Sequence, residues 1–164
     1  MRHKAFALMM AALFSLTLLG CTREEPRIPT VGEASETVLT EHPAVALETT
    51  EASYPTDVQA ITVRFTNSAE APYVCGRGYT LEIYSGGQWC DLTPAPSEKS
   101  FGVTDEGYSL YTGEPVEITH DLEYYGTLFD PGTYRVVSKV HVLDAPEERE
   151  TIAAEFTITQ RESG

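Results

Sequence analysis

The chain has 164 residues and a formal net charge of −14, with 11 Lys and Arg against 25 Asp and Glu. Such an acidic surface is repelled by nucleic acid and by anionic lipid headgroups, so neither is expected as a partner of the folded part. The length beyond residue 42 fits one domain with a single core.

A short apolar leader opens the sequence. Basic residues at 2–4 precede a mainly apolar stretch over 5–19, and Leu18, Leu19 and Gly20 lead directly into Cys21. This layout is that of a secretory signal, and its end resembles the lipobox of bacterial lipoproteins. The resemblance implies that residues 1–20 are removed as a signal peptide and that Cys21 carries a diacylglycerol and fatty acyl chains such as palmitate.

Two other interpretations fit the leader less well. A plainly cleaved signal needs small residues at its cleavage site, and only Gly20 stands next to the apolar end. An uncleaved membrane span needs about 20 apolar residues, and this stretch is shorter. Two acyl chains hold a protein stably at a membrane where one does not. The predicted location is therefore the extracytoplasmic face of the cell membrane, with a lipid anchor.

Residues 21–42 are predicted to be the lipidated cysteine and a flexible linker. Pro, Glu, Ser and Thr are frequent there, and no apolar period is sustained. A linker of this length reaches on the order of 70 Å when fully extended and spans about 25 Å as a coil. Either length would lift the domain off the bilayer.

From Ala44 onward, short apolar alternations separated by turn residues predict β-strands. They are expected at Ala44–Thr49, Val58–Thr66, Tyr79–Tyr84, Gln88–Thr93, Tyr108–Tyr111, Pro115–Leu122, Tyr134–Leu143 and Thr151–Thr159. No helix longer than two turns is predicted. About seven short strands indicate an all-β antiparallel sandwich over residues 43–160, with a tail at 161–164.

The strongest hairpin signal is Gly86-Gly87 between two predicted strands. A two-residue loop there would pair Tyr84 with Trp89 and Ile83 with Cys90. A slip of one residue would exchange the faces, so the register stays open at this point. The Pro- and Ser-rich segment 94–107 is predicted to be a loop with a short edge strand near Phe101.

Asp130-Pro131-Gly132-Thr133-Tyr134 resembles the tyrosine corner of immunoglobulin-type sandwiches, in which the Tyr134 hydroxyl would bond to upstream backbone. Together with three more segments, it resembles the bacterial Ig-like domain family. These segments are ITVRFTN at 61–67, YTLEIYSGGQW at 79–89 and GEPVEITHDL at 113–122. The resemblance covers about 44–160 and implies an extracytoplasmic sandwich without a catalytic centre.

If Cys21 is acylated, Cys75 and Cys90 remain as an even pair, and a disulfide is chemically permitted outside the cytoplasm. Two free buried thiols are the alternative. The pair differs from the inter-sheet disulfide of antibody domains, because both cysteines precede the strand of Tyr134. A bond would tie the CGRG loop at 75–78 to the hairpin.

No constellation in the sequence points to catalysis, a cofactor or a metal. His42, His120 and His141 lack metal-ligand spacing. His120 before Asp121 could be a base and its orienter, but a half-buried strand residue bonded to a carbonyl is favoured. Acidic residues near Asp144 lack the spacing of a calcium loop, which favours a solvated turn. The many tyrosines fill core edges or form an interaction surface.

The predicted function is therefore a non-enzymatic, lipid-anchored module that offers a binding or accessory surface to an unknown extracytoplasmic protein or envelope polymer. Two alternatives remain from other classes. The protein could be an inhibitor or regulatory subunit that inserts the loop 94–107 into an extracellular enzyme, or a structural component of the envelope.

Overall fold

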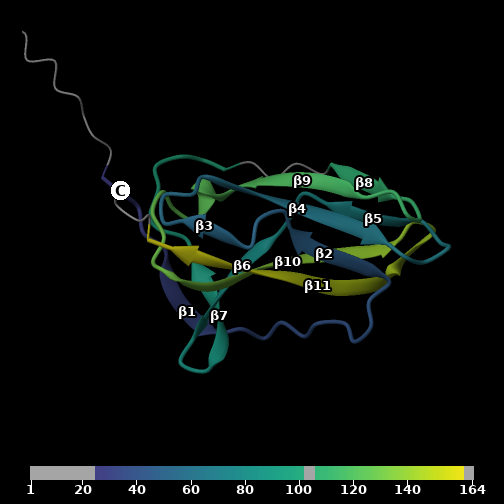
Figure 1. The fold of residues 1–164 in the computed structure, drawn as a ribbon, viewed down its shortest axis with the longest axis horizontal. Coiled ribbons are helices and arrows are strands. Elements are labelled where there is room, and N and C mark those ends of the chain that lie inside the picture. Colours follow the sequence, from purple (N-terminus) through teal and green to yellow (C-terminus); the bar gives the residue numbers. More distant parts are fainter. Residues whose placement is uncertain (1–24, 102–105, 161–164) are drawn as a thin grey trace, which may run out of the picture.

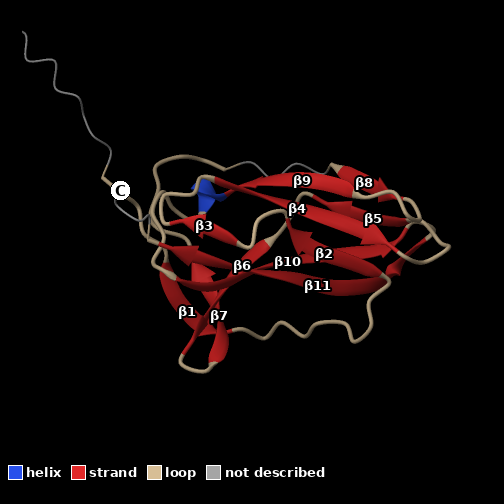
Figure 2. Cartoon of the chain, viewed as in Figure 1, coloured by secondary structure: helices blue, strands red, loops and turns tan. Residues whose placement is uncertain are grey.

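A computed structural model describes residues 25–101 and 106–160. The predicted signal peptide 1–20, Cys21 and the tail 161–164 lie outside these residues. The described chain forms eleven strands and one 3₁₀ turn, packed as two facing sheets (Figures 1 and 2). The all-β sandwich expected from the alternation is confirmed.

The larger sheet has eight strands in the order β1-β7-β6-β10-β11-β3, with β5 and β8 continuing it beside the far part of β10. Its strands are β1 (Thr30–Ala34), β3 (Ser53–Pro55), β5 (Tyr73–Gly76), β6 (Thr80–Ser85), β7 (Gln88–Thr93), β8 (Gly107–Leu110), β10 (Gly132–Val142) and β11 (Ala145–Thr159). The smaller sheet has the order β2-β4-β9, with β2 (Val45–Thr49), β4 (Ala60–Asn67) and β9 (Val116–Asp121). The 3₁₀ turn η1 (Leu122–Tyr124) follows β9 directly.

The core lies between the two sheets and follows the predicted alternation. In β4, Ile61, Val63 and Phe65 are at most 1% exposed, whereas Arg64 between them faces solvent. Tyr134 and Val136 of β10 meet them from the larger sheet and are equally buried. Period-2 burial on one face of each strand is what fixes the pairing register of such a sheet.

Three strands, β1, β3 and β5, lie outside the expected ranges, where the sequence has no alternating pattern. In β3, Ser53–Pro55 pair in parallel with Thr157–Thr159 at the sheet edge. β5 carries only four residues, and β1 lies inside the predicted linker. Near Phe101, no strand is present among the described residues. Such short strands form only where a partner strand is available, and the residue pattern of one strand does not show which partner it will meet.

The hairpin register is confirmed. Ile83 pairs with Cys90 and Tyr84 pairs with Trp89 across Gly86 and Gly87, both of which have positive φ angles of 60° and 87°. The left-handed backbone at both positions suits a turn that matches strand twist and is accessible to glycine without strain. The Tyr84 and Trp89 rings meet edge to face with centroids 5.3 Å apart.

The flexible linker expected over 21–42 is wrong for its described part. β1 pairs antiparallel with β7, with Thr30 opposite Thr93 and Val31 opposite Leu92. Figure 1 shows the chain leaving β1 and running along the sandwich to β2 at the other end. A polar composition predicted disorder, but here backbone hydrogen bonds to an open sheet edge hold the segment in place.

No helix among the described residues is long and apolar enough to cross a membrane.

Candidate functional site

The segment at 35–40, called the strap below, crosses the outer face of the larger sheet. At one end the Ser35 N–H donates to the carbonyl of Trp89 at 2.9 Å. At the other, the Thr40 N–H donates to the Thr151 carbonyl, and the Thr151 N–H donates to the Thr40 hydroxyl, both at 2.9 Å. These hydrogen bonds reach β7 at one end of the strap and β11 at the other, and β6 and β10 lie between these two strands. The strap therefore covers a face of the sheet that alternation alone would leave to solvent.

A buried ion pair lies beneath the strap. Arg135 Nε donates to Glu82 Oε2 at 2.7 Å, and the Ser35 hydroxyl donates to Glu82 Oε1 at 2.8 Å. The Arg135 guanidinium also lies over the Trp89 ring, 4.3 Å from its centroid. Arg135 lies on the outer face of β10 but is only 6% exposed. A charged pair taken from water needs such hydrogen bonds at each oxygen to offset its desolvation.

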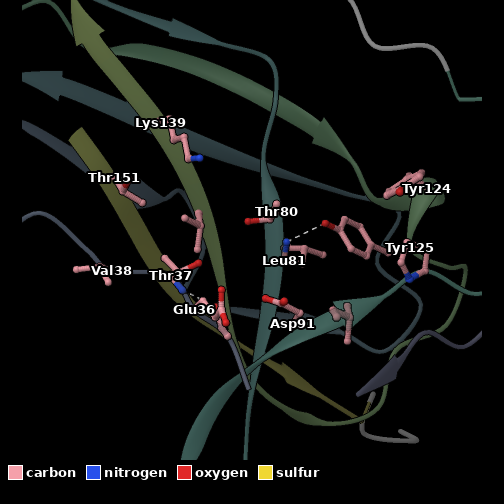
Figure 3. Close-up of a pocket in the computed structure, with 14 residues that line it drawn as sticks. Glu36, Thr37, Val38, Thr80, Leu81, Asp91, Tyr124, Tyr125, Lys139 and Thr151 are labelled. Carbon is pink, nitrogen blue, oxygen red and sulfur yellow. Dashed lines mark hydrogen bonds between the residues drawn. The ribbon is translucent and has the colours of Figure 1, made fainter. Parts of the chain in front are cut away.

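A groove of about 540 Å³ opens between the strap and the C-terminal end of η1 (Figure 3). Thr37 and Val38 form one wall, and Tyr124 and Tyr125 form the other. The floor carries Thr80, Asp91, Lys139 and neighbouring residues of the larger sheet. Val38 is 83% exposed and Tyr124 is 47% exposed. Apolar side chains on both rims above a mixed polar floor are the composition of a binding surface.

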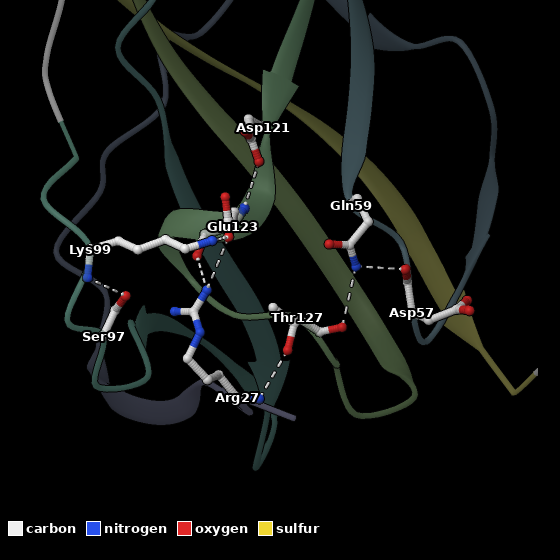
Figure 4. A network of polar contacts seen from close by, with 8 residues as sticks. All are labelled: Arg27, Asp57, Gln59, Ser97, Lys99, Asp121, Glu123 and Thr127. Carbon is white, nitrogen blue, oxygen red and sulfur yellow. Dashed lines mark hydrogen bonds and ion pairs between the residues drawn. The ribbon is translucent and has the colours of Figure 1, made fainter. Parts of the chain in front are cut away.

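The end of the sandwich where the described chain begins is called the anchor end and carries Arg27, Ile28, Lys99, Glu123 and Tyr124. The Arg27 N–H donates to the Thr127 hydroxyl at 2.9 Å, and the Arg27 carbonyl accepts from the Thr127 N–H at 2.8 Å (Figure 4). Its guanidinium donates to the Glu123 carbonyl at 2.9 Å. A hydrogen bond from Lys99 holds the pKa of the Glu123 carboxyl below its usual range.

The opposite end, called the acidic end, is built from the turns after β4, β8 and β10. These turns are joined: the Gly113 N–H donates to the Asn67 carbonyl, and the Leu143 N–H donates to the Pro72 carbonyl. Its exposed carboxylates are Glu70, Glu114, Asp144, Glu147 and Glu148. Among the residues that the structure describes, no group of His, Cys, Asp or Glu is arranged to hold a metal ion.

Tyr134 has the geometry of a tyrosine corner. Its hydroxyl donates to the Asp130 carbonyl at 2.7 Å, and its side chain is 1% exposed. Burial raises the pKa of Tyr134 to about 12. The ring stacks on Phe156 with centroids 5.8 Å apart. The residue therefore joins the turn before β10 to the core, a structural role.

Cys75 and Cys90 are both buried free thiols. Cys75 pairs with Val140, whereas Cys90 pairs with Ile83, which in turn lies opposite Tyr134. The two positions thus differ by six residues along β10, about 20 Å at the rise of a strand. A disulfide needs Cα atoms within about 7 Å. The predicted bond is therefore wrong, and the alternative of two free thiols is found.

His120 is more buried than predicted, at 3% exposed. Its ring lies 4.2 Å from that of Tyr79, and its Nε2 has no hydrogen-bond partner, so the expected carbonyl contact is not made. Burial lowers the pKa of His120 to about 4. The carboxylate of Asp121 instead accepts from the Glu123 N–H and caps η1. The base-and-orienter pair is not formed.

The remaining predicted residues lie apart from one another. His42 has a positive φ of 58° in the turn before β2. His141 lies on β10, where it pairs with Val74 of β5 on one side and Arg149 of β11 on the other. The tyrosines divide as the two interpretations allowed: Tyr73, Tyr125 and Tyr134 are buried, whereas Tyr84, Tyr111 and Tyr124 are about half exposed. Sequence reasoning missed Ser35, Glu82 and Arg135. The sequence signal for the ion pair was an acidic residue in one predicted strand, Glu82, and a basic residue in another, Arg135, which face each other when the two strands pair.

Comparison with known proteins defines the family. The model of the bacterial Ig-like domain family matches residues 41–157, and the chain belongs to that family. No curated protein matches the chain.

Three solved structures are similar over much of the chain. A Bordetella pertussis protein assigned as ApaA is 21% identical, over 82% of this chain and 100% of that one, with a TM-score of 0.41. The Pseudomonas fluorescens alkylpurine DNA glycosylase AlkC bound to DNA is 16% identical, over 73% and 31%, with a TM-score of 0.35. The PapD-like domain 7 of human CEP192 is 13% identical, over 79% and 98%, also with a TM-score of 0.35. This chain spans about a third of the glycosylase.

Proposed function

We propose that the protein is a non-enzymatic, lipid-anchored Ig-like module on the extracytoplasmic face of the membrane, where it offers a surface to a protein partner. The observation that supports it is the order along the chain. Leu18, Leu19, Gly20 and Cys21 end a secretory leader, and a bacterial Ig-like domain follows at 41–157. A diacylated cysteine retains such a domain at the membrane without further help.

The groove beside the strap is the surface proposed for the partner. Val38 and Tyr124 lie on opposite rims and are 83% and 47% exposed, and apolar surface left in water costs free energy unless a partner covers it. Asp91 and Lys139 on the floor offer charges that would set orientation. Tyr124 is held by its contact with Phe101, whose ring centroid is 5.4 Å away, so this rim needs little ordering when it binds.

Membrane attachment is tested with Cys21→Ser in cells that process lipoproteins. The wild type is expected in the membrane fraction with incorporated labelled palmitate. The variant is expected to lose the label and the membrane association while its domain keeps the same unfolding midpoint. A variant that remains membrane-bound, or that unfolds, contradicts the division into anchor and module.

The partner is sought with a photo-crosslinking residue placed at Val38 or at Tyr124, followed by mass spectrometry. A probe at Tyr111, which is also exposed but lies on the acidic end, is the matched control. Crosslinks from the groove positions alone support the proposed surface. Capture of a single extracellular enzyme would favour the inhibitor or regulatory subunit, and capture of envelope polymer would favour a structural role.

The inhibitor alternative assigned insertion to the loop 94–107. Residues 102–105 of that loop lie outside the described residues. Lys99 and Phe101 contact Glu123 and Tyr124, and the Ala95 N–H donates to the Tyr125 carbonyl at 2.8 Å. The first half of the loop is thus fastened to the domain, which favours the groove over the loop as the presented surface.

A further inference from the structure

The fastening of the N-terminal segment changes how far the domain can stand from an anchor at Cys21. A flexible linker ending at residue 42 would allow a reach on the order of 70 Å. Arg27, only six residues after Cys21, is instead fixed to Thr127 through both its N–H and its carbonyl. Six residues span about 20 Å at full extension. The free tether is therefore less than a third of the length that composition suggested.

The point of fastening also determines which end lies near the anchor. Arg27 lies beside η1 and the start of β1, at one end of the long axis of the sandwich (Figures 2 and 4). The acidic end lies at the other, beyond β10, which has eleven residues and a length of about 35 Å. A tether of about 20 Å keeps the first end close to the attachment point, whereas the second is free to point away.

The side chains of the anchor end are compatible with this orientation. At the anchor end, Ile28 and Tyr124 are 42% and 47% exposed, and the cations Arg27 and Lys99 share Glu123. Tyrosine and apolar side chains beside cations suit the headgroup region of a bilayer. Exposed carboxylates lie at both ends, with Asp57, Asp121 and Asp130 at the anchor end, so the orientation rests on the length of the tether.

We infer that the anchor end faces and contacts the lipid bilayer to which Cys21 is attached, so that the domain stands on the membrane with its acidic end outermost. The inference rests on the proposed lipidation of Cys21. It places the membrane against Ile28 and close to Tyr124, so a partner in the proposed groove would approach from the side of the strap, which runs along the sandwich.

The test uses the full acylated chain in vesicles of phosphatidylethanolamine and phosphatidylglycerol that contain headgroup-nitroxide lipid. Single reporter cysteines, labelled with a fluorophore, replace Ile28 or Tyr124 at the anchor end and Tyr111 or Leu143 at the acidic end. All four positions are 42–54% exposed, so the pairs are matched, and the native Cys75 and Cys90 are buried. The nitroxide is expected to quench the reporters at 28 and 124 and leave those at 111 and 143 unchanged.

A second variant separates tether length from surface chemistry. A Gly/Ser insertion of about 20 residues between Glu25 and Pro26 adds a root-mean-square span of about 25 Å. It is expected to abolish the quenching at 28 and 124. Equal quenching at both ends, or stronger quenching at 111, overturns the orientation while acylation stands. A chain that carries no acyl group and does not bind the vesicles overturns both this inference and the proposed anchoring.

Discussion

Glu82 and Arg135 form an ion pair across β6 and β10 whose side chains are only 1% and 8% exposed. The two residues are direct cross-strand partners on the outer face of the larger sheet. That face is dry at this point because Ser35 of the strap closes over it and donates to the second carboxylate oxygen. The pair therefore depends on a segment more than forty residues earlier in the chain.

Removal of one partner from this pair is expected to be costly. Arg135→Met leaves the Glu82 carboxylate buried without its cation, which lowers the free energy of unfolding by about 3–5 kcal/mol. The double variant Glu82→Leu/Arg135→Met removes both charges and is expected to lose much less. Urea unfolding of both single variants and the double variant gives the coupling. Costs that simply add would show that the pair is not coupled in the folded state.

Attachment of the chain at the anchor end is tested at Gly126. A Cβ there would lie 2.5 Å from the Arg27 carbonyl oxygen and 2.8 Å from Pro29 Cδ. Gly126→Ala is thus expected to displace Arg27, to lower stability by about 1–3 kcal/mol, and to speed hydrogen exchange of the Thr127 amide. Gly78→Ala is the control, since no atom lies within 4 Å of its Cβ position. Similar effects from both changes would argue against a specific contact.

Cys75 and Cys90 are expected to remain thiols in the oxidised protein. In the Cys21→Ser variant, denaturation without reductant should allow two alkyl groups to be added, as measured by mass spectrometry. The folded protein should react slowly, because both side chains are buried and burial raises the pKa of the Cys75 thiol to about 11. A denatured, unreduced sample that takes up no alkyl group would instead reveal a disulfide.

Because His120 is buried, the free energy of unfolding is expected to fall in mild acid. Its folded pKa of about 4 lies below the unfolded value of 6.5, so the unfolded chain binds the proton more readily between these values. The contribution is complete above pH 6.5 and is lost as the pH falls toward 4. From pH 7 to pH 5 the loss is about 2 kcal/mol. His120→Phe keeps a ring against Tyr79 and should remove this part of the pH dependence; equal slopes for both proteins would disprove it.

Tyr134→Phe removes the hydroxyl that bonds to the Asp130 carbonyl and changes little else. Because that carbonyl loses its donor near the core, unfolding is expected to become easier by about 1–2 kcal/mol. Tyr111→Phe, at a position 54% exposed, is expected to stay within about 0.5 kcal/mol of the wild type. Thermal and urea unfolding of the two variants measure the difference.

Much of the fold could be predicted because alternation and turn chemistry are local properties. Ile61, Val63 and Phe65 alternate with polar residues in the sequence, and the structure buries all three. Gly86-Gly87 limits the hairpin to few turn types. The DPGTY segment likewise contains both the tyrosine and the backbone to which it bonds. Each of these features is encoded within about ten residues.

The strap and the ion pair could not be predicted in this way. The Ser35 contact with Glu82 spans 47 residues, and the Thr40 contact with Thr151 spans 111. A polar segment that fills its hydrogen bonds on a distant strand has the same composition as a disordered one. The predicted disulfide was wrong for a related reason. An even number of cysteines permits a bond, but only the strand register along β10 shows how far apart Cys75 and Cys90 lie.

The family match begins at residue 41, just after the strap ends. The residues matched by the family model and the residues that pack into the sandwich are therefore not the same set in this chain. A recombinant domain cut at the family boundary would lose β1 and the Ser35 hydroxyl and would expose Glu82 and Arg135 to water. Residues outside the shared domain thus supply part of its folding free energy, and a stability measured on the shared part alone would underestimate that of the protein.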